Sequence, residues 1–192
     1  MTQKVVTFGE LMLRLSPPGF ERLFQSPLLS ATFGGGEANV AASLAQFGLH
    51  SCYVTCLPAH AIGDGAVRAL RAEGIDTAHV VRAGSRVGIY FAETGASQRA
   101  GTVVYDRAQS AISEIAPGAV KWDEVMSGAA WFHVTGITPA LGAKAAAATE
   151  AAIASASTSS KPAPASAPRR SSTTAPTRRS ARWRPAKSRG RR

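Results

Sequence analysis

The feature that most constrains the fold is a regular alternation of strand-like and helix-like segments over the first 155 residues. Short apolar runs at residues 4–8, 50–57 and 129–136 are typical of buried strands. Residues 36–47, residues 65–73 and the Ala-rich stretch 141–156 have the composition or spacing of helices. Strand, helix and strand in succession predict an α/β fold with a parallel sheet and right-handed crossovers.

One element interrupts this alternation. Residues 87–94 and 101–107 read as two strands around a polar loop, which predicts a β-hairpin with a longer turn. Residues 11–16 show partial alternation and form a candidate strand near the N-terminus. The hairpin is therefore expected to be an inserted β element, such as a lid.

The composition changes abruptly at about Ser155. Residues 156–192 contain no Leu, Ile, Val, Met or Phe and a single aromatic residue, Trp183. Residues 158–192 carry 11 of the 22 Lys and Arg and none of the 12 acids, so the rest of the chain is close to neutral. Too little apolar surface is available to offset the entropy of ordering, which predicts a disordered, basic, low-complexity tail. Such a tail would bind polyanions without sequence preference, so a nucleic-acid or anion binder is one alternative function.

The cysteines and the hydropathy pattern exclude several classes of protein. Cys52 and Cys56 lie four residues apart on a predicted strand, about 13 Å along its axis, which is too far for a disulfide. We interpret them as core thiols rather than a metal or redox pair. No apolar run approaches the roughly 18 residues of a membrane span, and the N-terminus lacks a signal-peptide pattern. The chain is expected to be cytoplasmic.

A glycine-rich stretch, FGGGEAN at residues 33–39, precedes the first predicted helix. Glycines at a helix N-terminus allow close approach to a ligand and leave N–H groups free for it. No Lys-Ser/Thr follows as in a phosphate-binding P-loop, and Glu37 would repel the pyrophosphate of a dinucleotide. These residues alone leave a structural turn, a neutral polar ligand and a phosphate open.

The glycines followed by Asn39 on an Ala-rich helix resemble the N-terminal motif of the ribokinase-like sugar kinases. Four further segments resemble that family in order and spacing: TFGELMLRLSPP, LPAHAIGDGAVRALRAEGIDT, GIYFAETGASQRAGTVVYDRAQSAIS and FHVTGITPALG. The GGxEANVA form and the hairpin are similar to the 2-keto-3-deoxygluconate kinase branch of the phosphofructokinase-B-type family. The resemblance covers residues 4–155. It implies that residues 1–155 are the N-terminal part of a ribokinase-like, three-layer (Rossmann-like) domain, incomplete, with lid segments at about 11–33 and 86–108.

The resemblance implies ATP-dependent phosphorylation of 2-keto-3-deoxygluconate to its 6-phosphate, with ATP and Mg²⁺. It places sugar contacts at Gly34, Gly35, Asn39, Tyr90, Tyr105 and Arg107. A guanidinium can bind the carboxylate of a sugar acid through two parallel hydrogen bonds. Simpler interpretations stay open, namely cross-strand packing of the tyrosines and a surface ion pair of Arg107 with Asp106 or Glu93. Fructokinase or ribokinase specificity, a lone sugar-binding domain and a homodimer through the lid also stay open.

The family's second half supplies a Gly-Ala-Gly-Asp motif whose Asp is the base, and this sequence contains no such motif. We therefore expect no catalytic residue and no nucleotide site in the chain, and expect it to be inactive. The residue bias of the tail favours a frameshift at about residues 155–160. Asp64, Asp76 and the four histidines are interpreted as structural, while Glu10 is a minor candidate for a sugar contact.

Overall fold

The structure, a computed structural model, describes residues 3–159. Its core is a three-stranded parallel sheet in the order β4-β1-β9, formed by β1 (Lys4–Phe8), β4 (His50–Val54) and β9 (Ala129–His133). The central strand β1 is mostly apolar and is buried from Val5 to Phe8, as a strand covered on both faces should be. The predicted α/β fold with a parallel sheet is confirmed.

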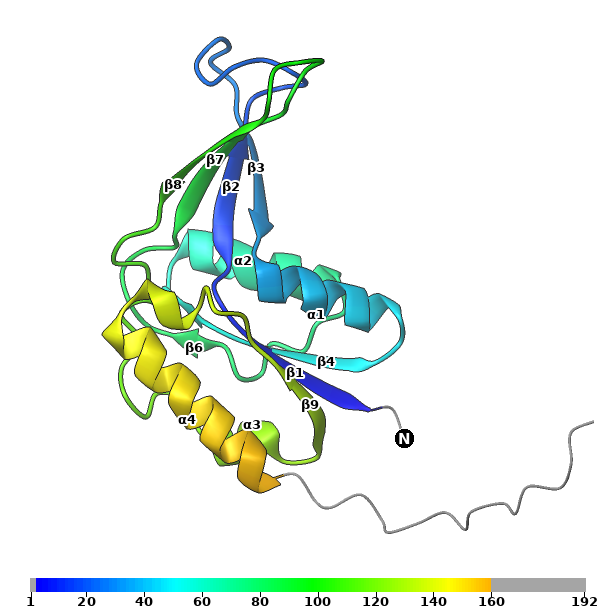
Figure 1. Ribbon diagram of the computed structural model, residues 1–192, viewed down its shortest axis with the longest axis vertical. Helices are drawn as coiled ribbons and strands as arrows, with labels where there is room; N and C mark the ends of the chain where they lie inside the picture. Colours follow the sequence, from blue (N-terminus) through cyan, green and yellow to red (C-terminus); the bar gives the residue numbers. More distant parts are fainter. Residues whose placement is uncertain (1–2, 160–192) are drawn as a thin grey trace, which may run out of the picture. The chain divides into compact units, whose positions relative to one another are not determined.

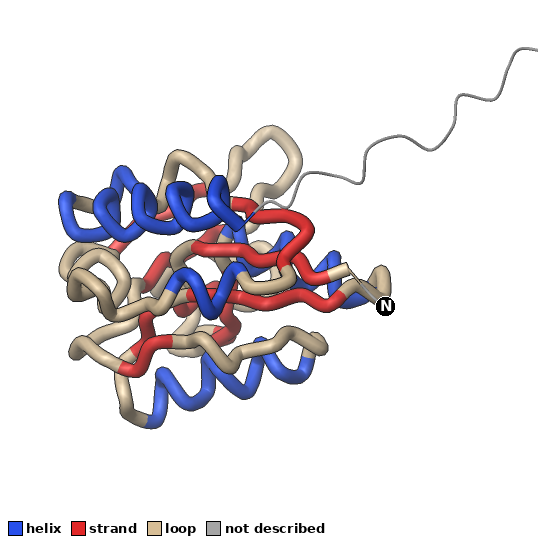
Figure 2. The backbone as a smooth tube through the Cα atoms, turned by 90° about the horizontal axis from the view of Figure 1, so that it is seen from below, coloured by secondary structure: helices blue, strands red, loops and turns tan. Residues whose placement is uncertain are grey.

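Helices cover both faces of this sheet (Figures 1 and 2). Helices α1 (Gly36–Gln46) and α2 (Ala61–Ala72) lie on one face, and α3 (Trp122–Met126) and α4 (Ala143–Ser159) lie on the other. Side chains alternate along a strand, so β4 supplies both layers. Cys52 and Val54 pack in the cluster that contains Trp122, whereas Tyr53 packs in the cluster that contains Leu70. The result is a three-layer arrangement with one apolar core on each side of the sheet.

A second sheet rises above the core sheet as a separate blade (Figure 1). It has the order β3-β2-β7-β8 and is formed by β2 (Met12–Ser16), β3 (Ser30–Gly34), β7 (Ile89–Glu93) and β8 (Thr102–Asp106). Strands β7 and β8 form the predicted hairpin, with Tyr90 directly opposite Tyr105. We call this four-stranded sheet the lid. Two short strands, β5 (Cys56–Leu57) and β6 (Val81–Arg82), form a third sheet, and the 3-10 turn η1 (Pro139–Leu141) precedes α4.

The structure corrects two sequence-based boundaries and adds two elements. The single strand predicted at residues 50–57 is divided at Thr55, whose carbonyl accepts a hydrogen bond from Val81 N–H at 2.9 Å. Helix α2 begins at Ala61 rather than 65, because His60 caps it by accepting from Ile62 N–H at 3.3 Å. Strand β3 and helix α3 were not predicted.

Both cysteines are buried and free, as expected for core thiols. Within the described residues, no helix is long and apolar enough to cross a membrane. Residues 156–159, which were expected to begin the disordered tail, form the C-terminal end of α4, so the prediction of disorder is wrong for them. The rest of the predicted tail, on which the predictions of disorder and polyanion binding mainly depend, lies outside the described residues, as does a test of the frameshift.

Candidate functional site

A pocket of about 210 Å³ lies where the lid meets the carboxyl end of β1 and the start of α1. It is smaller than the roughly 300–1,000 Å³ of pockets for drug-sized ligands, so it suits a small metabolite. Residues from all three elements and from the loop after β9 line it: Glu10, Met12, Gly35, Gly36, Glu37, Asn39, Tyr90, Tyr105, Arg107 and Ile137.

Five of the six residues predicted to contact the sugar line this one pocket, although they lie far apart in the sequence. The exception, Gly34, lines a neighbouring cleft of about 630 Å³ beside α1, α2 and β3. Gly34 still borders the pocket, because a Cβ added there would lie 2.9 Å from the Tyr90 hydroxyl oxygen. The fold therefore gathers all six positions into one region.

The glycine loop is built for close packing at Gly35. A Cβ at this position would lie 2.1 Å from the Glu10 carbonyl oxygen, so only glycine fits without a backbone shift. The first turn of α1 follows at once, with Asn39 N–H donating to the Gly35 carbonyl at 2.8 Å. The Asn39 side chain is exposed, and its amide makes no hydrogen bond to any described residue. This amide is thus free for a polar ligand.

The lid hairpin contributes two tyrosines to the pocket. The ring centroids of Tyr90 and Tyr105 lie 6.0 Å apart and the ring planes are tilted by 36°, so the centroid distance is within the range of interacting aromatic pairs. They are therefore cross-strand packing partners and pocket residues at the same time. Tyr105 is 58% exposed, which leaves one side of its ring toward solvent.

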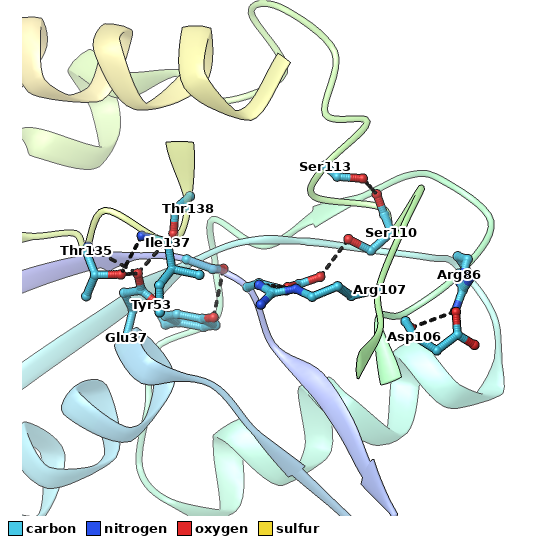
Figure 3. Close-up of polar contacts among 12 residues, drawn as sticks. Glu37, Tyr53, Arg86, Asp106, Arg107, Ser110, Ser113, Thr135, Ile137 and Thr138 are labelled. Atoms are coloured by element: carbon cyan, nitrogen blue, oxygen red, sulfur yellow. Dashed lines mark hydrogen bonds and ion pairs between the residues drawn. The ribbon is translucent and has the colours of Figure 1, made fainter. Parts of the chain in front are cut away.

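Arg107 follows β8, and its guanidinium carbon lies 5.4 Å from the centroid of the Tyr105 ring. Its ion-pair partner is the buried carboxylate of Glu10. The expected alternative, a surface pair of Arg107 with Asp106 or Glu93, is wrong. Those two acids pair instead with Arg86 at 2.9 Å and Arg99 at 3.6 Å, respectively (Figure 3 shows the Arg86–Asp106 pair).

A second buried acid, Glu37, ties α1 to the loop that follows β9. Its Oε1 atom accepts hydrogen bonds from Thr135 N–H at 3.1 Å, Thr135 Oγ1 at 2.6 Å and Thr138 Oγ1 at 3.0 Å (Figure 3). Glu37 is only 2% exposed. Burial, and then the nearby Glu37 carboxylate, raise the pKa of Tyr53 well above its ordinary value. The acid that the sequence placed after the glycines therefore fixes the loop that carries Ile137 into the pocket.

The other acids considered from the sequence make structural contacts. Asp64 lies in the first turn of α2, where it pairs with Arg82 at 2.6 Å rather than capping the helix. Asp76 pairs with His50 at 3.0 Å and accepts from Ala78 N–H at 2.9 Å. Burial opposes ionisation of Asp76, but these hydrogen bonds outweigh it and lower its pKa below the ordinary value. No three His, Cys, Asp or Glu side chains between residues 3 and 159 are placed to hold a metal ion.

The chain is similar to carbohydrate kinases in sequence and in structure. The family model described as pfkB family carbohydrate kinase matches residues 2–177. A 2-dehydro-3-deoxygalactonokinase of Haloferax volcanii is 36% identical over 141 residues, which cover 73% of this chain and 44% of that protein. A 2-dehydro-3-deoxygluconokinase of Bacillus subtilis is 29% identical over 146 residues, or 75% of this chain and 44% of that protein.

Among solved structures, the 2-dehydro-3-deoxygluconokinase of Thermotoga maritima superposes with a TM-score of 0.80 and 52% identity, covering 81% of this chain and 48% of that one. The chain thus spans less than half the length of these relatives. The fold is ribokinase-like, and its resemblance to 2-keto-3-deoxygluconate kinases holds for their N-terminal part. The chain belongs to the pfkB family of carbohydrate kinases.

Proposed function

We propose that the pocket binds 2-keto-3-deoxygluconate, the substrate of an ATP-dependent kinase that forms the 6-phosphate. The observation that carries the proposal is Arg107, the one cationic side chain among the residues that line this small pocket, where it lies beside Tyr105 and pairs with Glu10. Relatives that act on 2-dehydro-3-deoxy sugar acids support it.

Each pocket residue has a role that its chemistry allows. The Arg107 guanidinium would donate parallel hydrogen bonds to the substrate carboxylate. The Tyr90 and Tyr105 hydroxyls and the Asn39 amide would donate to or accept from the sugar hydroxyls and carbonyl. Gly34 and Gly35 would let the sugar approach the backbone at the start of α1.

Binding of a neutral ketose, as in a fructokinase, is the second candidate. One observation favours it, namely that Glu10 already neutralises Arg107. The formal charge of the three ionisable groups Glu10, Glu37 and Arg107 is then negative, which opposes a second carboxylate.

We assign no ATP or Mg²⁺ site and no general base to the described residues. Both acids that line the pocket already have partners: Glu10 forms an ion pair with Arg107 and accepts a hydrogen bond from Ser110, and Glu37 accepts hydrogen bonds from Thr135 and Thr138. We therefore propose that residues 3–159 bind and orient the sugar, and that the chain alone does not transfer phosphate.

Two kinds of macromolecular partner are also proposed, namely a second copy of the chain and a polyanion. A homodimer through the lid would use its edge strand β8, on which Val103 and Val104 are each 49% exposed. A polyanion-binding role would use the basic tail, which lies outside the described residues. Binding that weakens steeply with salt would identify the tail as the binding element.

Isothermal titration calorimetry with 2-keto-3-deoxygluconate and with fructose tests the proposal. We expect heat from the sugar acid, little from fructose, and much weaker but measurable acid binding in R107A. The variant R86A is a matched control, because it removes a nearby arginine that pairs with Asp106 but does not line the pocket. Preferential binding of fructose would support the second candidate, and release of ADP from Mg-ATP by this chain would contradict the proposed lack of phosphate transfer.

A further inference from the structure

We propose that Glu10 is a positioning residue, which holds the Arg107 guanidinium in the pocket and so determines the preference for a sugar acid over a neutral sugar. This inference rests on the proposed function. Glu10 lies between β1 and β2, where the core sheet passes into the lid, and Arg107 lies directly after β8. One ion pair therefore connects the core to the far edge strand of the lid.

The Glu10 carboxylate is held from two sides. Its Oε2 atom pairs with Nη2 of Arg107, and its Oε1 atom accepts from Ser110 Oγ at 2.6 Å. The side chain is 3% exposed. Backbone also encloses it, since a Cβ at Gly88 would lie 2.6 Å from Oε1. The carboxylate is consequently enclosed and held by Ser110. It contacts the guanidinium as an ion pair, since neither Oε2 of Glu10 nor Nη2 of Arg107 makes a hydrogen bond among the described residues.

The ion pair between Glu10 and Arg107 is expected to stay intact. A buried carboxylate without a partner is strongly unfavourable, so Glu10 retains Arg107 even though 23% of the Arg107 side chain is exposed. The guanidinium is planar and carries five donors in a fixed arrangement. Glu10 engages Nη2, and the Tyr105 ring lies 5.4 Å from the guanidinium carbon. The Nε atom of Arg107, like Nη2, is buried without a hydrogen-bond partner among the described residues, so the guanidinium has unfilled donors for a ligand.

Two effects of Glu10 on a sugar carboxylate have opposite signs, which makes the inference testable. As a positioning residue, Glu10 strengthens binding because it holds Arg107 in place. As a nearby negative charge, it weakens binding of an anion. The substitution Glu10→Gln removes the charge and retains the shape, and its amide oxygen can still accept from Ser110. Positioning predicts weaker acid binding in E10Q, whereas charge alone predicts tighter binding.

The experiment is a double-mutant cycle on the full chain, measured by calorimetry with 2-keto-3-deoxygluconate and fructose. We expect E10Q to weaken acid binding about tenfold, within the range for residues in contact, and to leave any fructose binding unchanged. In the R107A background the same substitution should have no further effect. The control D106N breaks the neighbouring Arg86–Asp106 pair and should bind like the wild type. Acid binding by E10Q that equals or exceeds the wild type, or equal effects of E10Q with and without Arg107, would overturn the inference.

A second readout needs no ligand and separates this inference from the proposed function. In NMR spectra, the Arg107 side-chain Nε–H signal should be sharp and slowly exchanging in the wild type, and broad or rapidly exchanging in E10Q. If E10Q does not fold, S110A tests the same carboxylate by removing its other partner, and the Arg107 signal should broaden there as well. An Arg107 signal unchanged in the folded variant would refute positioning. Failure of the wild-type chain to bind the sugar acid would instead refute the proposed function.

Discussion

Replacing Gly35 by alanine should destabilise the protein strongly, although the change adds one methyl group. The new Cβ would lie 2.1 Å from the Glu10 carbonyl oxygen and 3.2 Å from its carbon. Both are backbone atoms, so no side-chain rotation relieves the clash. An ordinary contact begins near 3.4 Å, and the backbone at Glu10 or at the start of α1 would therefore have to move by more than 1 Å.

The adjacent glycine supplies a matched control. A Cβ at Gly36 meets no atom within 4 Å, and Gly36 is the first residue of α1. G36A should therefore stabilise the protein by about 0.5–1 kcal/mol, since alanine loses less backbone entropy than glycine in a helix. G35A should cost about 3 kcal/mol, at the upper end of the range for overpacked sites.

Urea unfolding followed by circular dichroism measures both variants. For a slope of roughly 1–3 kcal/mol per M, G35A should lower the midpoint by about 1–3 M, and G36A should raise it slightly. If G35A unfolds within about 0.5 kcal/mol of the wild type, or is more stable than G36A, the contact between the glycine loop and Glu10 is not as described.

Three further predictions concern the core and its polar contacts. The pKa of Asp76 is lowered in the folded state, so its contribution to the free energy of unfolding is complete above the unfolded pKa of about 3.9 and is lost as the pH falls through the folded value. The free energy of unfolding of D76N should therefore fall less steeply with acid than that of the wild type, which retains the pair with His50, and an equal acid dependence would contradict this. T135V should lower stability by about 1–3 kcal/mol in a thermal melt, because the buried Glu37 carboxylate loses a donor at 2.6 Å, and an unchanged melt would contradict that contact. Burial and the nearby Asp76 raise the pKa of the Cys52 thiol to about 11, so a thiol reagent at pH 8 should react only on unfolding, and rapid labelling of the native protein would contradict this.

The elements that the sequence predicted well are those with long periodic or fully apolar patterns, such as β1, α1 and α4. Strand β3 was missed because Ser30, Ala31 and Thr32 are all exposed and show no alternation. The division of the strand at Thr55 depends on a hydrogen bond from Val81, a contact between residues distant in the sequence. Tertiary contacts of this kind override local propensity, and no local pattern reports them.

The candidate site could be predicted as a set of residues but not as a network. Family-like motifs pointed to Asn39, Tyr90 and Arg107, which the structure places around one pocket. Nothing in the sequence indicated that Glu10 would accept from a serine 100 positions away, or that Glu37 would bind a threonine 98 positions away. Serine and threonine are common residues and belong to no motif here, so these contacts can be recognised only in the folded structure.

The most direct test of the central claim is an NMR titration of the isotopically labelled chain with 2-keto-3-deoxygluconate. We expect the amide signals of Gly34, Gly35 and Asn39 and the side-chain signal of Arg107 to shift together with one saturating affinity. Signals of β9 near Trp131, an exposed residue that does not line the pocket, should not move. Shifts that gather elsewhere, or no shifts at high sugar concentration, would contradict the assignment of this pocket as a sugar-acid site.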